Sequence, residues 1–288
     1  PDSIVTKAST DVNLNTPFSV FVSGKYAYLT SRYGGLSIFD ISNPSSIITK
    51  GNTGVGLSSP WGVYVSGKYA YVANYDSGYL SIFDVSNPDS IVTKATTAVG
   101  LINLVSVYVS GKYAYITDSG NNRISIFDIS NPDSIVTKDY VDTYSTPVTV
   151  YVSGKYAYLA EYNGLSIFDI SNPDSIVTKA STDVGSINAQ GVYVSGKYAY
   201  VVNVLNERLS IFDISNPDSI VTKGYTTAGL DDPRGLYVSG KYAYVTNESN
   251  NRLSIFELNN TDTPTFNTGA ATISNLQVYD NAQFDNDV

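Results

Sequence analysis

The hexapeptide SGKYAY occurs six times in this 288-residue chain, at intervals of 42 to 44 residues. About 13 residues after each copy begins LSIFD or a close match, and SNPDSIVTK or a close match follows five of these. A repeat of this length without a helical pattern of apolar residues is typical of small sheets repeated around an axis or along a stack. We therefore expect one large all-β domain. The copies begin at Ser23, Ser66, Ser110, Ser153, Ser195 and Ser239.

Each repeat unit predicts four antiparallel strands joined by short connections. In the second unit we expect strands at residues 62–65, 69–73, 79–85 and 90–96. The glycine of SGK can adopt the positive φ that a short hairpin needs, and the proline of SNPD ends the third strand. The aspartate that ends each SIFD is expected to cap the turn that follows. The unit is thus a four-stranded meander.

The strands predict how these sheets pack. YAYVA and LSIF carry apolar or aromatic residues on both faces, as expected for sheets that are covered on both sides. Large tyrosines alternate with small alanines, so neighbouring sheets can interlock. Six such sheets around an axis form a six-bladed β-propeller.

The two ends of the repeat region predict how the ring closes. The last unit ends after residues 254–258 without a fourth strand, and the chain begins with an unmatched fourth strand, PDSIVTK, at residues 1–7. We expect these two segments to pair and close the ring, because an open stack would leave two apolar faces in water. Because the chain starts within a repeat unit, we also expect it to be part of a longer product.

The closed propeller is expected to span residues 1–259. Residues 260–288 do not match the repeat and form a polar linker followed by a strand-like stretch at residues 271–280. This tail is either the start of a further domain or a strand through which molecules assemble.

The chain contains no cysteine and no histidine. These absences exclude disulfides, thiolate nucleophiles, ordinary zinc sites and the usual general base near neutral pH. We therefore expect no enzyme and no cofactor, although calcium held by separate loops stays open as an alternative. No apolar run approaches the ~18 residues of a membrane span, so membrane insertion is not expected.

The six units differ at one end only. The turns SGK and SNPDS share one end of each meander and are nearly invariant, whereas the loops at the other end vary in every copy. All twelve lysines lie in the repeated parts, and the variable loops hold five arginines against eleven acidic residues. Nucleic acids and anionic membranes need a basic surface, so this negative rim favours a protein or glycan partner.

The candidate binding residues are the aromatic and charged side chains of this variable rim. Trp61, the only tryptophan, stands directly before a first strand. It either anchors a partner or packs between blades as its equivalents Phe18 and Val105 would. Candidates for stacking are Tyr33, Trp61, Tyr75, Tyr79, Tyr144 and Tyr162. Candidates for polar contacts are Arg32, Asp76, Asp118, Arg123, Glu161, Glu207, Arg208, Arg234, Glu248 and Arg252.

These motifs resemble those of LVIVD-repeat β-propellers. YAYVxD-type second strands, LSIFD in place of the LVIVD pentapeptide and the following DISNP carry the resemblance, and YVTN at residues 244–247 is similar to the related YVTN repeats. The resemblance covers residues 1–259. One departure is the isoleucine of SNPDSI, where that family often has a second proline. The resemblance implies a propeller that is mostly extracellular or on the cell surface, and it supplies no catalytic residues.

Three functions fit this pattern. The first is an extracellular or cell-surface interaction module, an adhesin or fibre component that binds a protein or glycan through the variable rim. The second is a propeller lyase or hydrolase with carboxylates or a divalent cation in the central funnel, which needs polar groups that converge there. The third is a multivalent lectin with one weak site per blade, which repeated site residues would favour. Because the rim loops differ, we expect the interaction module.

Overall fold

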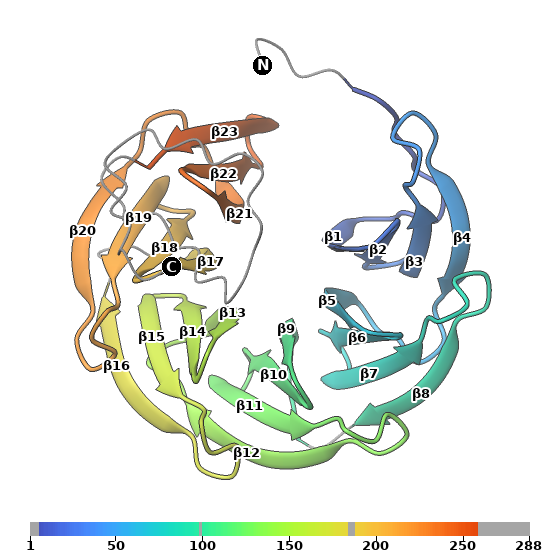
Figure 1. Cartoon of the computed structure of the whole chain (residues 1–288), viewed down its shortest axis with the longest axis horizontal. Helices are drawn as coiled ribbons and strands as arrows, with labels where there is room; N and C mark the ends of the chain where they lie inside the picture. Colours follow the sequence, from blue (N-terminus) through green and yellow to red (C-terminus); the bar gives the residue numbers. More distant parts are fainter. Residues whose placement is uncertain (1–5, 98–99, 184–187, 259–288) are drawn as a thin grey trace, which may run out of the picture.

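The computed structural model describes residues 6–97, 100–183 and 188–258. These residues form six antiparallel sheets arranged around a central axis, and the predicted six-bladed β-propeller is confirmed (Figure 1). Blades 1 to 5 each contain four strands, in the order in which the strands occur in the chain. The described part of blade 6 contains three.

The first strand of each blade lies nearest the axis and pairs with the second (Figure 1). The first strands are β1 (Pro17–Ser23), β5 (Pro60–Ser66), β9 (Leu104–Ser110), β13 (Pro147–Ser153), β17 (Ala189–Ser195) and β21 (Pro233–Ser239). The second strands are β2 (Tyr26–Ser31), β6 (Tyr69–Asn74), β10 (Tyr113–Asp118), β14 (Tyr156–Glu161), β18 (Tyr198–Asn203) and β22 (Tyr242–Asn247).

The third and fourth strands build the outer half of each blade. The third strands are β3 (Gly35–Asp40), β7 (Tyr79–Asp84), β11 (Arg123–Asp128), β15 (Gly164–Asp169), β19 (Arg208–Asp213) and β23 (Arg252–Glu257). The fourth strands are β4 (Ile48–Thr53), β8 (Val92–Thr97), β12 (Val136–Asp142), β16 (Val177–Asp183) and β20 (Val221–Thr226).

The first and second strands are joined by two-residue hairpin loops, as predicted. Gly67 occupies the first loop position with a φ of 58°, and a Cβ added there would meet no atom within 4 Å. The glycine is therefore required by the backbone conformation and not by lack of space.

The core consists of apolar layers between neighbouring blades. Leu80 and Ile82 of β7 pack with Val107 and Val109 of β9, and all four side chains are buried. Equivalent residues pack at the other four described joints between consecutive blades. Burial of each such side chain contributes about 1.5 to 3 kcal/mol. This sandwiching explains why LSIF is apolar on both faces.

The motif turns are held by the aspartates that end the third strands. Asp84 Oδ1 accepts hydrogen bonds from the backbone N–H of Ser86 at 2.9 Å and from its hydroxyl at 2.6 Å. These hydrogen bonds lower the pKa of the Asp84 carboxyl below its ordinary value. Blades 1, 3, 4 and 5 repeat the backbone hydrogen bond, so the predicted capping role is confirmed.

Lysines of the fourth strands reach the next blade. Lys94 is the extra residue of a β-bulge opposite Ile82 and Phe83, and its Nζ lies 2.8 Å from Asp133 of blade 3. The same bridge occurs in three further pairs, Lys50 with Asp89, Lys138 with Asp174, and Lys179 with Asp218. Because the aspartates are exposed, each bridge adds little to the stability of the fold.

Two predictions concern segments that the structure does not describe. The pairing of residues 1–7 with the last blade depends on residues 1–5, and the tail at residues 260–288 is likewise outside the described ranges. Across residues 6–97, 100–183 and 188–258, no helix has the length and apolarity that a membrane crossing needs.

Candidate functional site

A bulge near the start of every first strand directs one side chain to the central axis. In blade 1, Pro17 pairs with Ser31 and Ser19 with Thr30, so Phe18 has no partner in the ladder. A bulge bends its strand and re-aims the extra side chain. The corresponding register shifts contain Phe18, Trp61, Val105, Val148, Gln190 and Arg234, which we call the axial ring.

All six members of the axial ring line one cavity of about 870 Å³ on the axis. This volume lies within the usual range for small-molecule sites. Hydroxyl groups from several blades complete the lining, so the cavity offers both apolar surface and hydrogen-bonding groups. They belong to Thr16, Ser19, Ser106, Ser119, Thr146, Thr149 and Thr246, together with the phenol of Tyr75.

One wall of the cavity is a stack of three aromatic rings. The ring centroids of Phe18 and Trp61 are 4.6 Å apart with an interplanar angle of 28°, and those of Trp61 and Tyr75 are 4.4 Å apart at 14°. Gly62 lets the strand that carries Trp61 approach blade 3, since an added Cβ would lie 2.8 Å from the Val105 carbonyl oxygen. Close backbone packing thus places the indole at the axis.

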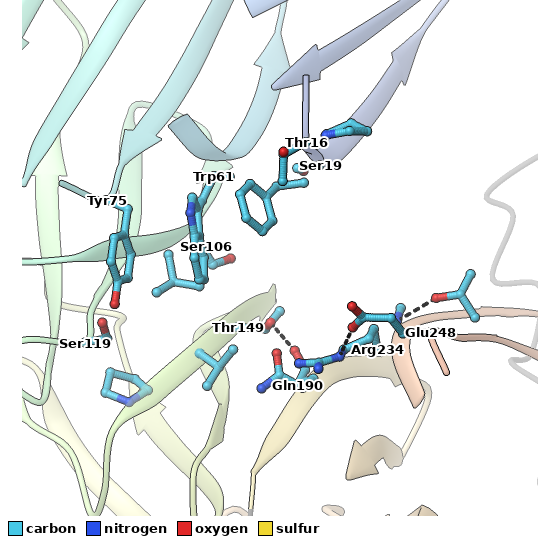
Figure 2. Close-up of a pocket in the computed structure, with 18 of the residues that line it drawn as sticks. Thr16, Ser19, Trp61, Tyr75, Ser106, Ser119, Thr149, Gln190, Arg234 and Glu248 are labelled. Carbon is cyan, nitrogen blue, oxygen red and sulfur yellow. Dashed lines mark hydrogen bonds and ion pairs between the residues drawn. The ribbon is translucent and has the colours of Figure 1, made fainter. Parts of the chain in front are cut away.

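The wall across the cavity is charged (Figure 2). Arg234 Nε lies 2.9 Å from Asp232 Oδ1 and 2.7 Å from Glu248 Oε2, and Arg234 Nη2 donates to Asp232 Oδ2 at 3.1 Å. All three groups are partly exposed, so the pairs add little stability, but they orient the guanidinium. Figure 2 shows Arg234 and Glu248 on one side of the cavity and Trp61 and Tyr75 on the other.

A second row of aromatic side chains surrounds the axis three residues further along the first strands. Neighbouring ring centroids in this row are 4.6 to 5.4 Å apart. Burial raises the pKa of Tyr108 to about 12, so this phenol stays neutral at physiological pH. The row, which we call the tyrosine collar, consists of Phe21, Tyr64, Tyr108, Tyr151, Tyr193 and Tyr237.

The structure brings four of the predicted site residues together at this cavity, namely Trp61, Tyr75, Arg234 and Glu248. Trp61 stacks on Phe18 of blade 1 and lines the cavity, so it packs between blades, as one alternative predicted. Its role as an anchor for a partner, the other alternative, stays a prediction.

Two predicted contact residues serve internal hydrogen bonds instead. Asp118 and Glu161 end second strands, and both side chains are fully buried. Asp118 Oδ1 accepts from the Ile102 N–H at 3.0 Å, and Glu161 Oε2 accepts from the Ser145 N–H at 2.7 Å. Asn74 Oδ1 accepts a hydrogen bond from the Ser58 N–H in the same way. These side chains hold the preceding loop in place and are not available to a partner.

The other predicted residues lie outside the cavity lining. The Arg123 guanidinium is 4.5 Å from the centroid of the Tyr140 ring, and that of Arg208 is 3.9 Å from the Tyr225 ring, so both arginines pack on their own blades. None of the remaining candidates lines the cavity: Arg32, Tyr33, Asp76, Tyr79, Tyr144, Tyr162, Glu207 and Arg252.

The sequence did not predict Gln190 as a site residue, and Phe18 was considered only as the residue equivalent to Trp61. Both could have been found by comparing the second residue of every first strand, where the side chain changes from blade to blade. Within the described ranges no three carboxylate, histidine or cysteine side chains gather closely enough to hold a metal ion.

Solved structures with a similar fold include enzymes that act on sugar lactones. A candidate 6-phosphogluconolactonase from Bacteroides uniformis matches with a TM-score of 0.73 and 20% identity, over 81% of this chain and 78% of its own. The periplasmic gluconolactonase of Pseudomonas aeruginosa matches with a TM-score of 0.73 and 16% identity, over 86% of this chain and 83% of its own. A protein from Lactobacillus plantarum matches with a TM-score of 0.76 and 14% identity, over 84% of this chain and 80% of its own. At these identities the likeness concerns the fold alone.

No curated protein matches the chain. The model of the LVIVD repeat, in contrast, matches six times and covers most of the chain. The matches span residues 18–54, 59–98, 104–143, 148–184, 188–227 and 232–264. The chain therefore belongs to the LVIVD repeat family.

Proposed function

We propose that the protein binds a carbohydrate in the axial cavity. The observation that carries this proposal is the pairing of an aromatic wall, Phe18, Trp61 and Tyr75, with a charged wall, Arg234 and Glu248, across one cavity of about 870 Å³. A sugar ring has an apolar C–H face that packs on an aromatic ring and hydroxyl groups around its edge. The cavity offers matching groups on its two walls.

The charged wall suits neutral hydroxyl groups. Arg234 supplies N–H donors and Glu248 supplies carboxylate acceptors side by side, so together they can bind neighbouring hydroxyls of one ring. Because Asp232 and Glu248 both pair with Arg234, the guanidinium is already compensated and attracts a free anion weakly. A neutral sugar is therefore the expected class of ligand.

A fluorescence titration tests this proposal directly. Trp61 is the only tryptophan and stacks in the aromatic wall, so a bound sugar should change its emission. We expect a glycan array to identify the sugar, and Phe18→Ala or Arg234→Gln to weaken its binding about tenfold, the equivalent of about 1.4 kcal/mol. Tyr33→Ala is the matched control, since Tyr33 is 68% exposed and lies outside the cavity. Unchanged emission with every sugar on the array would reject the proposal.

Lactone hydrolysis is the second candidate, favoured by two structural neighbours that are named as a 6-phosphogluconolactonase and a gluconolactonase. Glu248 would take a proton from a water molecule that attacks the lactone carbonyl carbon, while Arg234 N–H groups stabilise the carbonyl oxygen. The ring C–O bond then breaks, and the leaving alkoxide takes up a proton to give the hydroxy acid.

Proton release from gluconolactone separates the two candidates. A hydrolase should exceed the spontaneous rate and lose the excess in Glu248→Gln, whereas a binding module should bind the sugar without turnover. Binding is favoured because the Glu248 carboxylate is paired with Arg234 and no second acid or base group adjoins it in the cavity lining.

Location and biological role are part of the same proposal. The family resemblance and the cysteine-free composition support an extracellular or cell-surface module that uses sugar binding for adhesion. Fractionation of a tagged chain in its native host would test this, and a cytosolic product would count against adhesion.

A further inference from the structure

The axial cavity is confined to one end of the axis. Along the first strands its lining ends at the residue after the axial ring, which is Ser19 in blade 1, Ser106 in blade 3 and Thr149 in blade 4. No residue further along any of the six first strands, all of which the structure describes, contributes to the lining. The loops that follow the second strands add Ser119 and Glu248. The cavity therefore lies at the end of the axis that faces the variable loops.

The tyrosine collar closes the far end of this cavity. It lies three residues beyond the axial ring, and its five successive pairs of rings have centroids 4.6 to 5.4 Å apart, which is contact distance for aromatic side chains. Hydrogen bonds join the phenols of Tyr64 and Tyr108 and those of Tyr151 and Tyr193. Rings at this spacing fill the axis, so the collar leaves no bore wide enough for a sugar ring.

The opening between blades 1 and 6 does not offer a second polar exit. Figure 1 shows it between β1–β4 and β21–β23. The strands β1 and β23 expose the aliphatic side chains of Val20, Val22, Leu253 and Ile255. These groups cannot form hydrogen bonds with sugar hydroxyls, so a glycan that passed between them would lose its contacts with water without replacement. The polar way out of the cavity leads past the variable loops.

A cavity with one polar mouth distinguishes the end of a glycan chain from its interior. A sugar unit inside a chain is substituted at two positions and needs space for a neighbour on both sides, whereas a terminal unit is substituted once and keeps one more free hydroxyl. Arg234 and Glu248, whose Nε and Oε2 atoms are 2.7 Å apart, can bind neighbouring free hydroxyls. A further sugar attached to one of these hydroxyls would leave the wall groups unpaired, and such a loss discriminates strongly between ligands.

We propose that the axial cavity holds the terminal unit of a glycan chain, and that the rest of the chain leaves past the variable loops. This inference rests on the proposed sugar binding and adds which part of a glycan is recognised. The tyrosine collar excludes a chain that runs through the axis. The aromatic wall of Phe18, Trp61 and Tyr75 packs on the apolar face of the terminal ring. One protein molecule therefore binds at each recognised chain end.

Glycans extended at one end or the other test this proposal. For each free oligosaccharide that changes the Trp61 emission, we would titrate two derivatives, with a sugar of a different kind added at the reducing or at the non-reducing end. We expect one of the two additions to weaken binding at least about tenfold and the other to have little effect. Binding that survives both additions, or neither, would overturn the proposal. No change in emission with any oligosaccharide would instead reject sugar binding itself.

The number of protein molecules on a long chain gives an independent answer. We would mix the protein with homopolymers of the sugar that the titration identifies and measure the mass of the complexes by light scattering. We expect one protein molecule per chain at every chain length, because each chain has one recognised end. Phe18→Ala should weaken this assembly, and Tyr33→Ala, outside the cavity, should leave it unchanged. A number of bound molecules that grows with chain length would show binding to internal units and would overturn the proposal.

Discussion

At the scale of single residues, the last position of the second strand carries a different polar side chain, with different hydrogen bonds, in several of the blades. The last residue of the second strand is buried in every described blade, and it is serine, asparagine, aspartate or glutamate. Asn74 uses both halves of its amide, accepting from the Ser58 N–H and donating to the Ser81 hydroxyl. Two of these side chains are carboxyls: Asp118 pairs with the Arg123 guanidinium at 2.9 Å, whereas the hydrogen bonds to the Glu161 carboxyl come from neutral groups.

Burial raises the pKa of Glu161 to about 7, against hydrogen bonds that lower it. The unfolded chain ionises near the ordinary value of 4.5, so between pH 4.5 and 7 the folded chain holds the proton that the unfolded chain has released. Stability should therefore fall as the pH rises through this window and stay low above pH 7. The shift corresponds to roughly 3 kcal/mol.

Glu161→Gln should remove this pH dependence. The amide can donate to the Ser166 hydroxyl as Asn74 does to Ser81, so we expect the variant to gain up to roughly 3 kcal/mol at pH 8 and almost nothing at pH 4.5. Urea unfolding at the two pH values measures the difference. Asn74→Asp is the mirror-image control and should introduce the same kind of pH dependence into blade 2. A gain of equal size at both pH values would contradict this explanation.

At the scale of strands and turns, glycines with positive φ have two separate roles. Gly67 has open space around it, whereas Gly78 has a φ of 64° and an added Cβ would lie 2.1 Å from the Leu101 carbonyl oxygen. Gly78 thus lets the loop after β6 touch the segment that leads into blade 3. The first glycine shapes a hairpin, and the second allows two blades to come together.

Alanine substitutions should separate these roles. We expect Gly67→Ala to cost about 1 to 2 kcal/mol, because it forces an L-residue into the left-handed region. Gly78→Ala should cost about 2 to 5 kcal/mol, because a backbone clash adds to the same conformational cost. Thermal unfolding of the two variants gives the comparison. Equal losses would show that the loop near Leu101 can move away.

The strands and their joints follow from local pattern, but the site does not. The repeats place SGKYAY and LSIFD correctly, and β6 and β7 begin at the predicted residues. The bulge that turns Phe18 and Trp61 to the axis arises from pairing between strands, and no local motif marks it. The residue types near a variable loop also do not show which side chains are buried. The buried Asp118 and Glu161 therefore could not be distinguished from the cavity residues Arg234 and Glu248 before the fold was known.

At the scale of the whole molecule, the described residues form five equivalent joints between blades and leave an opening between blades 1 and 6 (Figure 1), and residues of both these blades line the cavity. Phe18 comes from blade 1, whereas Arg234 and Glu248 come from blade 6, so the two ends of the blade row both contribute walls. A ligand that touches both walls also connects the first and last blades.

The same valine should matter very differently at a joint and at the opening. Val65 is 5% exposed within the joint between blades 1 and 2, and Val22 is its equivalent in blade 1 at 55%. Val65→Ala removes buried methyl groups and should cost about 2 kcal/mol, whereas Val22→Ala should change the free energy of unfolding by less than about 0.5 kcal/mol. Denaturant unfolding of the two variants, with Val109→Ala as a second buried example, provides the measurement. A loss at Val22 as large as that at Val65 would mean that the first face is covered in solution.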